Sequence, residues 1–318
     1  MAFNFETSAN ANAEQKNANQ QLQTNDSVNN GSVGNNPDAD ILGLSAEEIL
    51  DPNTIDVTIS DKDTPLVILF GAKTSGKTMT LIRLARYLEE NLGYTIEPDP
   101  IFRPAHDLHY KRMCREFKAM TKGRFAPTGT DVMSYMLLKI SDDKGNALCQ
   151  ILEAPGEHYF DEEHMDRITP EYITKIQDAP NRKTWIVIVE ENWGTDQTSR
   201  ANYVSKIHEM VVGGNIIFMC HKVDLLKNRF LPGSGNVRKP NDKQIMKDLQ
   251  GQYPNIFKPY KNRNPFTSFA TPYLFSFVSF SSGTFTPVTQ GPDTGKQKYS
   301  VGPDFYAEEL WKQIKKNI

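Results

Sequence analysis

The sequence predicts an α/β fold in three layers, with a mostly parallel six-stranded sheet and one antiparallel edge hairpin. From Pro65 onward, short apolar segments typical of buried strands alternate with amphipathic segments typical of helices. Two of the apolar segments are separated only by "SDDKGN", a turn short enough for a hairpin. The chain has 318 residues, of which 38% are hydrophobic, and this is enough to bury the core of one large domain.

Composition divides the chain into three parts. Residues 1–40 are rich in Asn, Gln, Ser and Gly and offer almost nothing to bury, which predicts a disordered arm serving as a spacer or a partner-binding tail. Residues 41–63 form a linker in which "ILGLSAEEIL" predicts a short helix introduced by Ser45. Residues 64–318 form the domain itself.

Within the domain, each expected element follows from its apolar pattern. The strands are expected at residues 65–70, 132–140, 147–154, 184–190, 215–220 and 272–280. Helices are expected where apolar residues recur at helical spacing. These patterns are Leu81, Leu84, Ala85, Leu88 and Leu92; Tyr203, Ile207 and Val211; a weaker one from Lys243 to Leu249; and Tyr306, Leu310 and Ile314.

The stretch "LFGAKTSGKT" stands between the first strand and the first helix. Gly71, Gly76, Lys77 and Thr78 meet the pattern G-x-x-x-x-G-K-[ST] in the strand–loop–helix context that this phosphate-binding motif requires. The glycines let backbone N–H groups point inward, and the helix N-terminus adds partial positive charge. The residues expected around the phosphates, here called the phosphate loop, are Gly71, Ala72, Lys73, Thr74, Ser75, Gly76, Lys77 and Thr78.

Two members of the phosphate loop have distinct expected roles. Lys77, whose ammonium we expect to be exposed in the empty site, would reach the β- and γ-phosphates. Thr78 would offer its hydroxyl to Mg²⁺. The loop by itself does not select the base.

A second phosphate element is expected at "ILEAPGEHYF", residues 151–160. Glu153 ends a strand and would organise Mg²⁺, while Gly156 would meet the γ-phosphate with its backbone N–H. The stretch resembles the D-x-x-G switch motif of the translation-factor and Ras-like class of P-loop GTPases, with Glu153 in place of aspartate. In that family a threonine ahead of the hairpin closes over Mg²⁺, and in "RFAPTGTD" this is Thr128, with Thr130 as its rival.

The base is expected to be read by "FMCHKVD", residues 218–224. It resembles the N-K-x-D guanine motif of the same family, with His221 in place of asparagine. Asp224 can accept the N1–H and the exocyclic amine of guanine, whereas it would repel the N1 acceptor of adenine. Lys222 would lie along the ring. The loop "SFSSG" is similar in place to the family's loop that meets guanine O6, and it contributes Ser281 and Ser282.

The resemblance covers about residues 64–285 and the C-terminal helix, and it implies a P-loop NTPase fold that binds GTP or GDP with Mg²⁺. The family places a water-orienting side chain just after the switch glycine, where this chain has Glu157 and then His158. A carboxylate beside the γ-phosphate adds repulsion, so we expect slow hydrolysis unless a partner supplies an arginine. Arg124 is either a catalytic arginine in cis, by analogy with G-protein α subunits, or a solvated surface residue.

The leading hypothesis is therefore a GTPase that serves as a molecular switch for a protein partner or activator. The alternatives are a P-loop ATPase, if the match at Asp224 is accidental, and a nucleotide-locked scaffold that does not turn over. Insertions near 93–127 and 228–271 fall outside the resemblance. In the first, residues 103–124 carry seven Lys/Arg against two Asp/Glu and predict a helix with a basic face.

Charge and composition limit the remaining possibilities. A net charge of −3 argues against a protein that coats nucleic acid. The three cysteines lack metal-ligand spacing and are expected to be reduced core residues; they are Cys114, Cys149 and Cys220. No apolar run approaches the length of a membrane span and no signal peptide is evident, so we expect a cytoplasmic protein.

Overall fold

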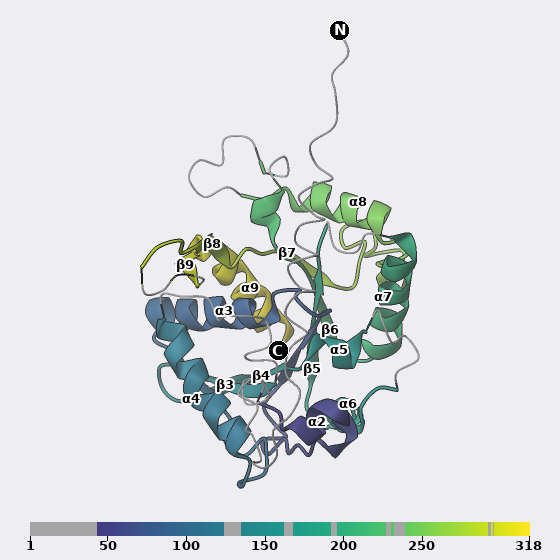
Figure 1. Ribbon diagram of the computed structural model, residues 1–318. Coiled ribbons are helices and arrows are strands. Elements are labelled where there is room, and N and C mark those ends of the chain that lie inside the picture. Colours follow the sequence, from purple (N-terminus) through teal and green to yellow (C-terminus); the bar gives the residue numbers. More distant parts are fainter. Residues whose placement is uncertain are drawn as a thin grey trace, which may run out of the picture. The chain divides into compact units, whose positions relative to one another are not determined.

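The computed structural model describes residues 43–123, 135–161, 168–191, 196–226, 230–231, 239–291, 294 and 296–318. All of them belong to one compact unit. A sheet runs through the middle of this unit, with α3, α4 and α9 on one side and α7 and α8 on the other (Figure 1). The helices are α2 (Ala46–Leu50), α3 (Lys77–Leu92), α4 (Leu108–Lys122), α5 (Gly156–Tyr159), α6 (Glu171–Asp178), α7 (Gln197–Met210), α8 (Asp242–Gln252) and α9 (Asp304–Asn317), with 3₁₀ turns η2 (Pro52–Thr54), η4 (Val223–Leu225) and η6 (Lys258–Tyr260).

The sheet has seven strands in the order β2-β3-β4-β1-β5-β6-β7, and a separate ribbon pairs β8 with β9. β1, β4, β5, β6 and β7 are parallel, and β2, β3 and β4 pair in antiparallel fashion at one edge. The strands are β1 (Leu66–Phe70), β2 (Thr95–Pro98), β3 (Met136–Ser141), β4 (Ala147–Glu153), β5 (Lys183–Val189), β6 (Asn215–Cys220), β7 (Ser276–Ser279), β8 (Gly283–Pro287) and β9 (Gln297–Val301).

The α/β class, the three layers, the mostly parallel sheet and the antiparallel edge hairpin are confirmed. The expected count of six strands is wrong, because β2 adds a seventh beside β3. β2 is short and half exposed, with Ile96 as its one buried residue, so it lacks an apolar run that could reveal it. The helices expected from apolar spacing are present, because that spacing marks the buried face of α3, α7 and α9.

The last strand is shorter than expected. We expected residues 272–280 to be extended, but β7 covers only Ser276–Ser279. Tyr273 pairs with Lys261 in an isolated bridge, and its ring lies 5.9 Å from Phe257 and 5.0 Å from Phe275. The aromatic residues before β7 therefore form a packed cluster in place of a longer strand.

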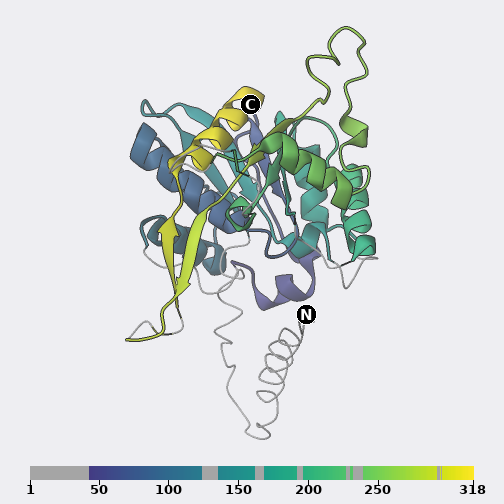
Figure 2. The ribbon, with the colours of Figure 1, turned by 90° about the horizontal axis from the view of Figure 1, so that it is seen from above.

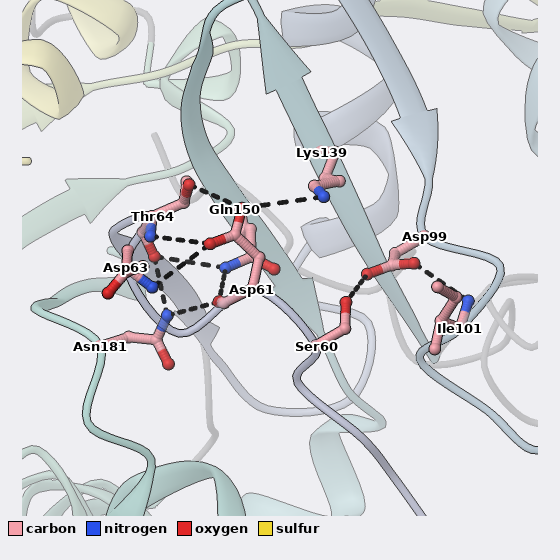
Figure 3. A network of polar contacts seen from close by, with 9 residues as sticks. All are labelled: Ser60, Asp61, Asp63, Thr64, Asp99, Ile101, Lys139, Gln150 and Asn181. Atoms are coloured by element: carbon pink, nitrogen blue, oxygen red, sulfur yellow. Dashed lines mark hydrogen bonds and ion pairs between the residues drawn. The ribbon is translucent and has the colours of Figure 1, made fainter.

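A turn before β1 fixes where that strand begins. The side-chain amides of Gln150 and Asn181 each donate to the carbonyl oxygens of Asp61 and Thr64, over distances of 2.8–3.2 Å (Figure 3). Gln150 belongs to β4, and Asn181 precedes β5, so both neighbours of β1 hold the same turn. This arrangement positions β1 along the sheet before the phosphate loop begins.

α2 is held against the segment that precedes α4. Ser45 caps α2 as expected: its hydroxyl accepts the N–H of Glu48, and the Glu48 carboxylate accepts the N–H of Ser45. Arg103, nearly buried, pairs with both Glu48 and Asp107 just ahead of α4. None of the described helices combines the length and apolar composition that crossing a bilayer requires.

A buried arginine on α3 holds the C-terminal part of the domain. Arg83 is fully buried, and its Nη2 donates to the Gly302 carbonyl at 3.1 Å and to Asp304 at 2.6 Å. Its Nε and Nη1 have no hydrogen-bond partner among the described residues. Asp304 therefore supplies the only carboxylate paired with this guanidinium in the described chain.

We expect Asp304→Ala to lower the free energy of unfolding by about 2–3 kcal/mol, because it leaves a buried cation without its counter-charge. Urea unfolding followed by circular dichroism measures this loss. Glu308→Ala, which removes an exposed carboxylate from the same helix, is the matched control and should change stability by less than about 0.5 kcal/mol. Equal losses in the two variants would contradict the assigned role.

Candidate nucleotide-binding site

The candidate site lies at the carboxyl edge of the parallel strands. Leu69 of β1 is level with Glu153 of β4, and Cys220 of β6 is level with Ser279 of β7. The segments that leave these four strands consequently meet at one edge, which is where α/β sheets of this type bind ligands.

The phosphate loop follows β1 and leads directly into α3. Gly76 has φ +89°, and a Cβ there would lie 2.4 Å from the His221 ring, so both its conformation and its surroundings require glycine. Lys77 donates from Nζ to the carbonyl oxygens of Gly71 and Ala72, each at 3.1 Å. Lys77 is buried, so the expectation of an exposed ammonium is wrong: the loop carbonyls satisfy it. Burial lowers the pKa of Lys77, and the charges of Glu153 and Glu157 act in the opposite direction.

Thr78 and Glu153 form the pair expected around a cation. The Thr78 hydroxyl donates to Glu153 Oε1 at 2.5 Å. Glu153 is buried, which raises its pKa, although the hydrogen bond from Thr78 and the charge of Lys77 favour its ionised form. Its second oxygen, Oε2, has no hydrogen-bond partner among the described residues. A hydroxyl and a carboxylate with a spare oxygen fit Mg²⁺, which takes most of its remaining ligands from phosphate and water.

Gly156, the glycine expected to meet the γ-phosphate, touches the phosphate loop. Gly156 is the first residue of α5, and a Cβ there would lie 2.3 Å from the Lys73 nitrogen and 2.4 Å from the Ala72 carbonyl carbon. Backbone therefore packs on backbone at this point. Thr128, Thr130 and Arg124 lie outside the described residues.

The two candidates for orienting a water differ in their surroundings. Glu157 is half buried, and its charge raises the pKa of Lys77, so it lies within electrostatic reach of the phosphate loop. His158 is buried, and its Nδ1 shares a 2.6 Å hydrogen bond with the hydroxyl of Tyr172 in α6. Of the two, Glu157 is the one associated with the loop.

The segment expected to read the base, residues 218–224 and here called the base motif, contacts the phosphate loop through Lys222. Its Nζ donates to the Thr74 carbonyl at 3.2 Å and pairs with Glu190 Oε2 at 2.9 Å. Thr74 (φ +63°) and Lys222 (φ +58°) are two of the three non-glycine residues with positive φ in the described chain. Such strained conformations cluster at functional sites, and here the two strained residues contact each other.

The serines of the last loop lie against the base motif. Ser281 donates to Asp224 at 2.7 Å, and Ser282 shares a 3.2 Å hydrogen bond with His221 Nε2. The His221 ring is buried between Gly76 and Phe280, whose ring it stacks on at 5.6 Å. Burial lowers the pKa of His221 to about 3, with a smaller contribution from Lys222, so the ring is neutral at physiological pH.

Sequence reasoning missed Glu190. It follows β5 directly and holds Lys222, and burial raises its pKa against the influence of Lys222. A carboxylate directly after a buried parallel strand was the available signal, the same one that identified Glu153. It was overlooked because no motif of the resembled family includes it.

Comparisons with known proteins give only distant likenesses. No family model and no curated protein matches this chain. Among solved structures, a Plasmodium falciparum protein assigned as nucleolar GTP-binding protein 1 is 16% identical, with a TM-score of 0.37 over 82% of this chain and 91% of that one. The S. cerevisiae Ski7 GTPase-like domain bound to GTP is 11% identical, with a TM-score of 0.31 over 86% of this chain and 53% of that one. The same domain bound to GDP and inorganic phosphate is 12% identical, with a TM-score of 0.33 over 85% of this chain and 52% of that one. These values are too low to support an argument about function.

We expect Gly156→Ala to lower the free energy of unfolding by about 1–3 kcal/mol, because its Cβ collides with loop backbone that has no room to move. Gly251→Ala is the matched control: it lies in α8 with open space around it and should stabilise the protein by about 0.5–1 kcal/mol. Urea unfolding of both variants gives the comparison. A Gly156→Ala variant that is as stable as the parent would contradict the close backbone contact at Gly156.

Proposed function

We propose that the chain is a GTP-binding switch that hydrolyses GTP slowly and controls a protein partner. The proposal rests chiefly on one contact, from Lys222 of the base motif to Thr74 of the phosphate loop, residues 148 positions apart in the chain. A nucleotide needs its phosphates and its base held at a fixed separation. A contact that joins the two binding segments fixes that separation before the ligand arrives.

The preference for guanine over adenine follows from Asp224. Its carboxylate is half buried and accepts from Ser281, so its orientation is set by a neighbour in the last loop. Oriented carboxylate oxygens suit the two N–H donors of guanine and oppose the acceptor N1 of adenine. GTP and GDP are therefore the proposed ligands, and a nucleic-acid ligand is not part of the proposal.

Mg²⁺ is the proposed cofactor, held by Thr78 and Glu153 and by Thr128 or its rival Thr130. When bound, the cation would neutralise charge on the β- and γ-phosphates. Lys77 would exchange one or both of its carbonyl partners for phosphate oxygens, and the backbone N–H of Gly156 would meet the γ-phosphate.

Slow turnover is proposed because the side chains beside Gly156 are poorly suited to orient a water. Glu157 brings negative charge toward a triphosphate, and the His158 ring is hydrogen-bonded to Tyr172. The same hydrogen bond favours a second candidate function, a scaffold that holds GTP without turning it over. Nucleotide released from purified protein distinguishes the two: intact GTP at one equivalent after long incubation supports the scaffold, and GDP supports the switch.

We expect Lys77→Ala to abolish GTP binding, because it removes the ammonium that compensates phosphate charge. Titration with a fluorescent GTP analogue measures the affinity. Circular dichroism is the fold control, since the substitution also frees two loop carbonyls. A folded variant that binds GTP as tightly as the parent would contradict the assignment of Lys77 to the nucleotide site.

We expect Asp224→Asn to weaken GDP binding by roughly tenfold to a hundredfold and to strengthen XDP binding, because an amide can donate to the carbonyl that xanthine carries in place of the 2-amino group. Dissociation constants for GDP, XDP and ADP, at fixed Mg²⁺ and salt, provide the measurement. Asp248→Asn, on α8, serves as the control and should leave all three constants unchanged. Tight ADP binding by the parent would instead favour a P-loop ATPase.

A further inference from the structure

A loop before β7 exposes two phenylalanines almost completely. In this loop, residues 261–274 and here called the aromatic loop, Phe266 is 92% exposed and Phe269 is 99% exposed. The next most exposed phenylalanine in the described part of the chain, Phe285, reaches 41%. Folded proteins rarely leave neighbouring aromatic side chains in water, and such a feature marks an interaction site.

The aromatic loop has a defined internal structure. Asn262 donates from Nδ2 to the Thr267 hydroxyl at 2.9 Å and to the Thr271 carbonyl at 2.8 Å. The side chain of Asn264 accepts the N–H of Phe266, and its carbonyl accepts those of Thr267 and Ser268. The backbone N–H groups of Phe266, Thr267 and Ser268 are thus paired within the loop, which lowers the cost of bringing this segment into an apolar phase.

The surroundings of the aromatic loop are basic. No Asp or Glu occurs between residues 249 and 292, and three exposed cations lie in the loop or just ahead of it: Lys258, Lys261 and Arg263. The C-terminal end of α9 adds Lys315 and Lys316 at the same edge of the sheet, because Asn317 hydrogen-bonds Ser276 at the start of β7. The nearby carboxylate of Glu209 is paired with Lys206.

The aromatic loop and the nucleotide site lie at opposite ends of the sheet. The loop leads into the first residue of β7, whereas Ser281 and Ser282 follow the last. Figure 2 shows the loop projecting from the body on the side where the C-terminus lies. Contacts made by the loop would therefore leave the nucleotide site open.

We propose that the aromatic loop docks this chain on an anionic lipid surface, with Phe266 and Phe269 entering the interface and the five cations facing the headgroups. A lipid surface is favoured over a protein partner by the shape of the loop. Its two phenylalanines are almost fully exposed and make no ring contact in the described chain, and the loop that carries them projects from the body (Figure 2), so the loop offers a protrusion rather than a packed face. A lipid interface needs no matching shape, and each cation adds attraction to anionic headgroups.

The test is flotation of the full chain with vesicles of phosphatidylcholine, with and without phosphatidylglycerol. The parent should bind only the anionic vesicles and should dissociate in high salt. Phe266→Ser with Phe269→Ser should lower partitioning by roughly tenfold for each phenylalanine, and Lys261→Ala with Arg263→Ala by about fivefold for each cation. Phe269→Trp keeps an aromatic anchor, so it should bind like the parent, with a blue-shifted emission on vesicles.

Two control variants separate this loop from other surfaces. Ile101→Ser with Leu108→Ser removes exposed apolar side chains elsewhere, and Lys111→Ala with Lys122→Ala removes cations from the basic face of α4. Both should bind vesicles like the parent, and every variant should keep the parent's affinity for a fluorescent GDP analogue. The proposal is overturned if the parent does not bind anionic vesicles, whether it stays monomeric or self-associates through the loop. The proposal is also overturned if the control variants lose vesicle binding while the Phe266→Ser, Phe269→Ser variant keeps it.

Discussion

The candidate site depends on where β1 lies along the sheet. Gln150 and Asn181, from the two sides of β1, hold the same two carbonyl groups in the turn before it. With that start fixed, Leu69 is level with Glu153, and the phosphate loop leaves the sheet beside the segment that carries Gly156. A shift of β1 by one residue would exchange its two buried faces and separate Thr78 from Glu153. The site is therefore a consequence of strand register, set at the opposite end of the strand.

Much of this arrangement could be predicted, because local patterns encode it. A buried run, a glycine loop and an amphipathic helix require no knowledge of the rest of the chain, and the parallel direction of most strands follows from the alternation of strands and helices. What could not be predicted depends on packing. β2 has one buried residue, the aromatic run before β7 packs as a cluster, and residues 288–296 separate β8 from β9, which is longer than the two-residue turn that marks a hairpin in a sequence. Within the site, the burial of Lys77 and the pairing of His158 with Tyr172 arise from contacts that no spacing reveals.

The buried charges of the site are balanced only in part. Burial raises the pKa of Glu153 and lowers that of Lys77, which disfavours both charges, whereas the charge of each residue favours the ionised form of the other. One oxygen of Glu153 and the ring Nδ1 of His221 have no hydrogen-bond partner among the described residues. Uncompensated polar atoms in a buried place are costly, and a ligand that supplies a cation and phosphate oxygens would offset that cost. This is the physical reason for expecting a nucleotide with its metal at this edge.

The two ends of the sheet are joined by β6 and β7, and this bears on how the proposed docking and the proposed switch would influence each other. Both strands are hydrogen-bonded to each other and packed between helices, and close packing of this kind resists gradual deformation. Coupling between distant sites needs an element with two arrangements that both sites bias. The segments expected to change with the γ-phosphate follow β4 or precede β3, on the other side of β1 from the aromatic loop. Docking through that loop would consequently orient the domain on a surface without depending on which nucleotide is bound.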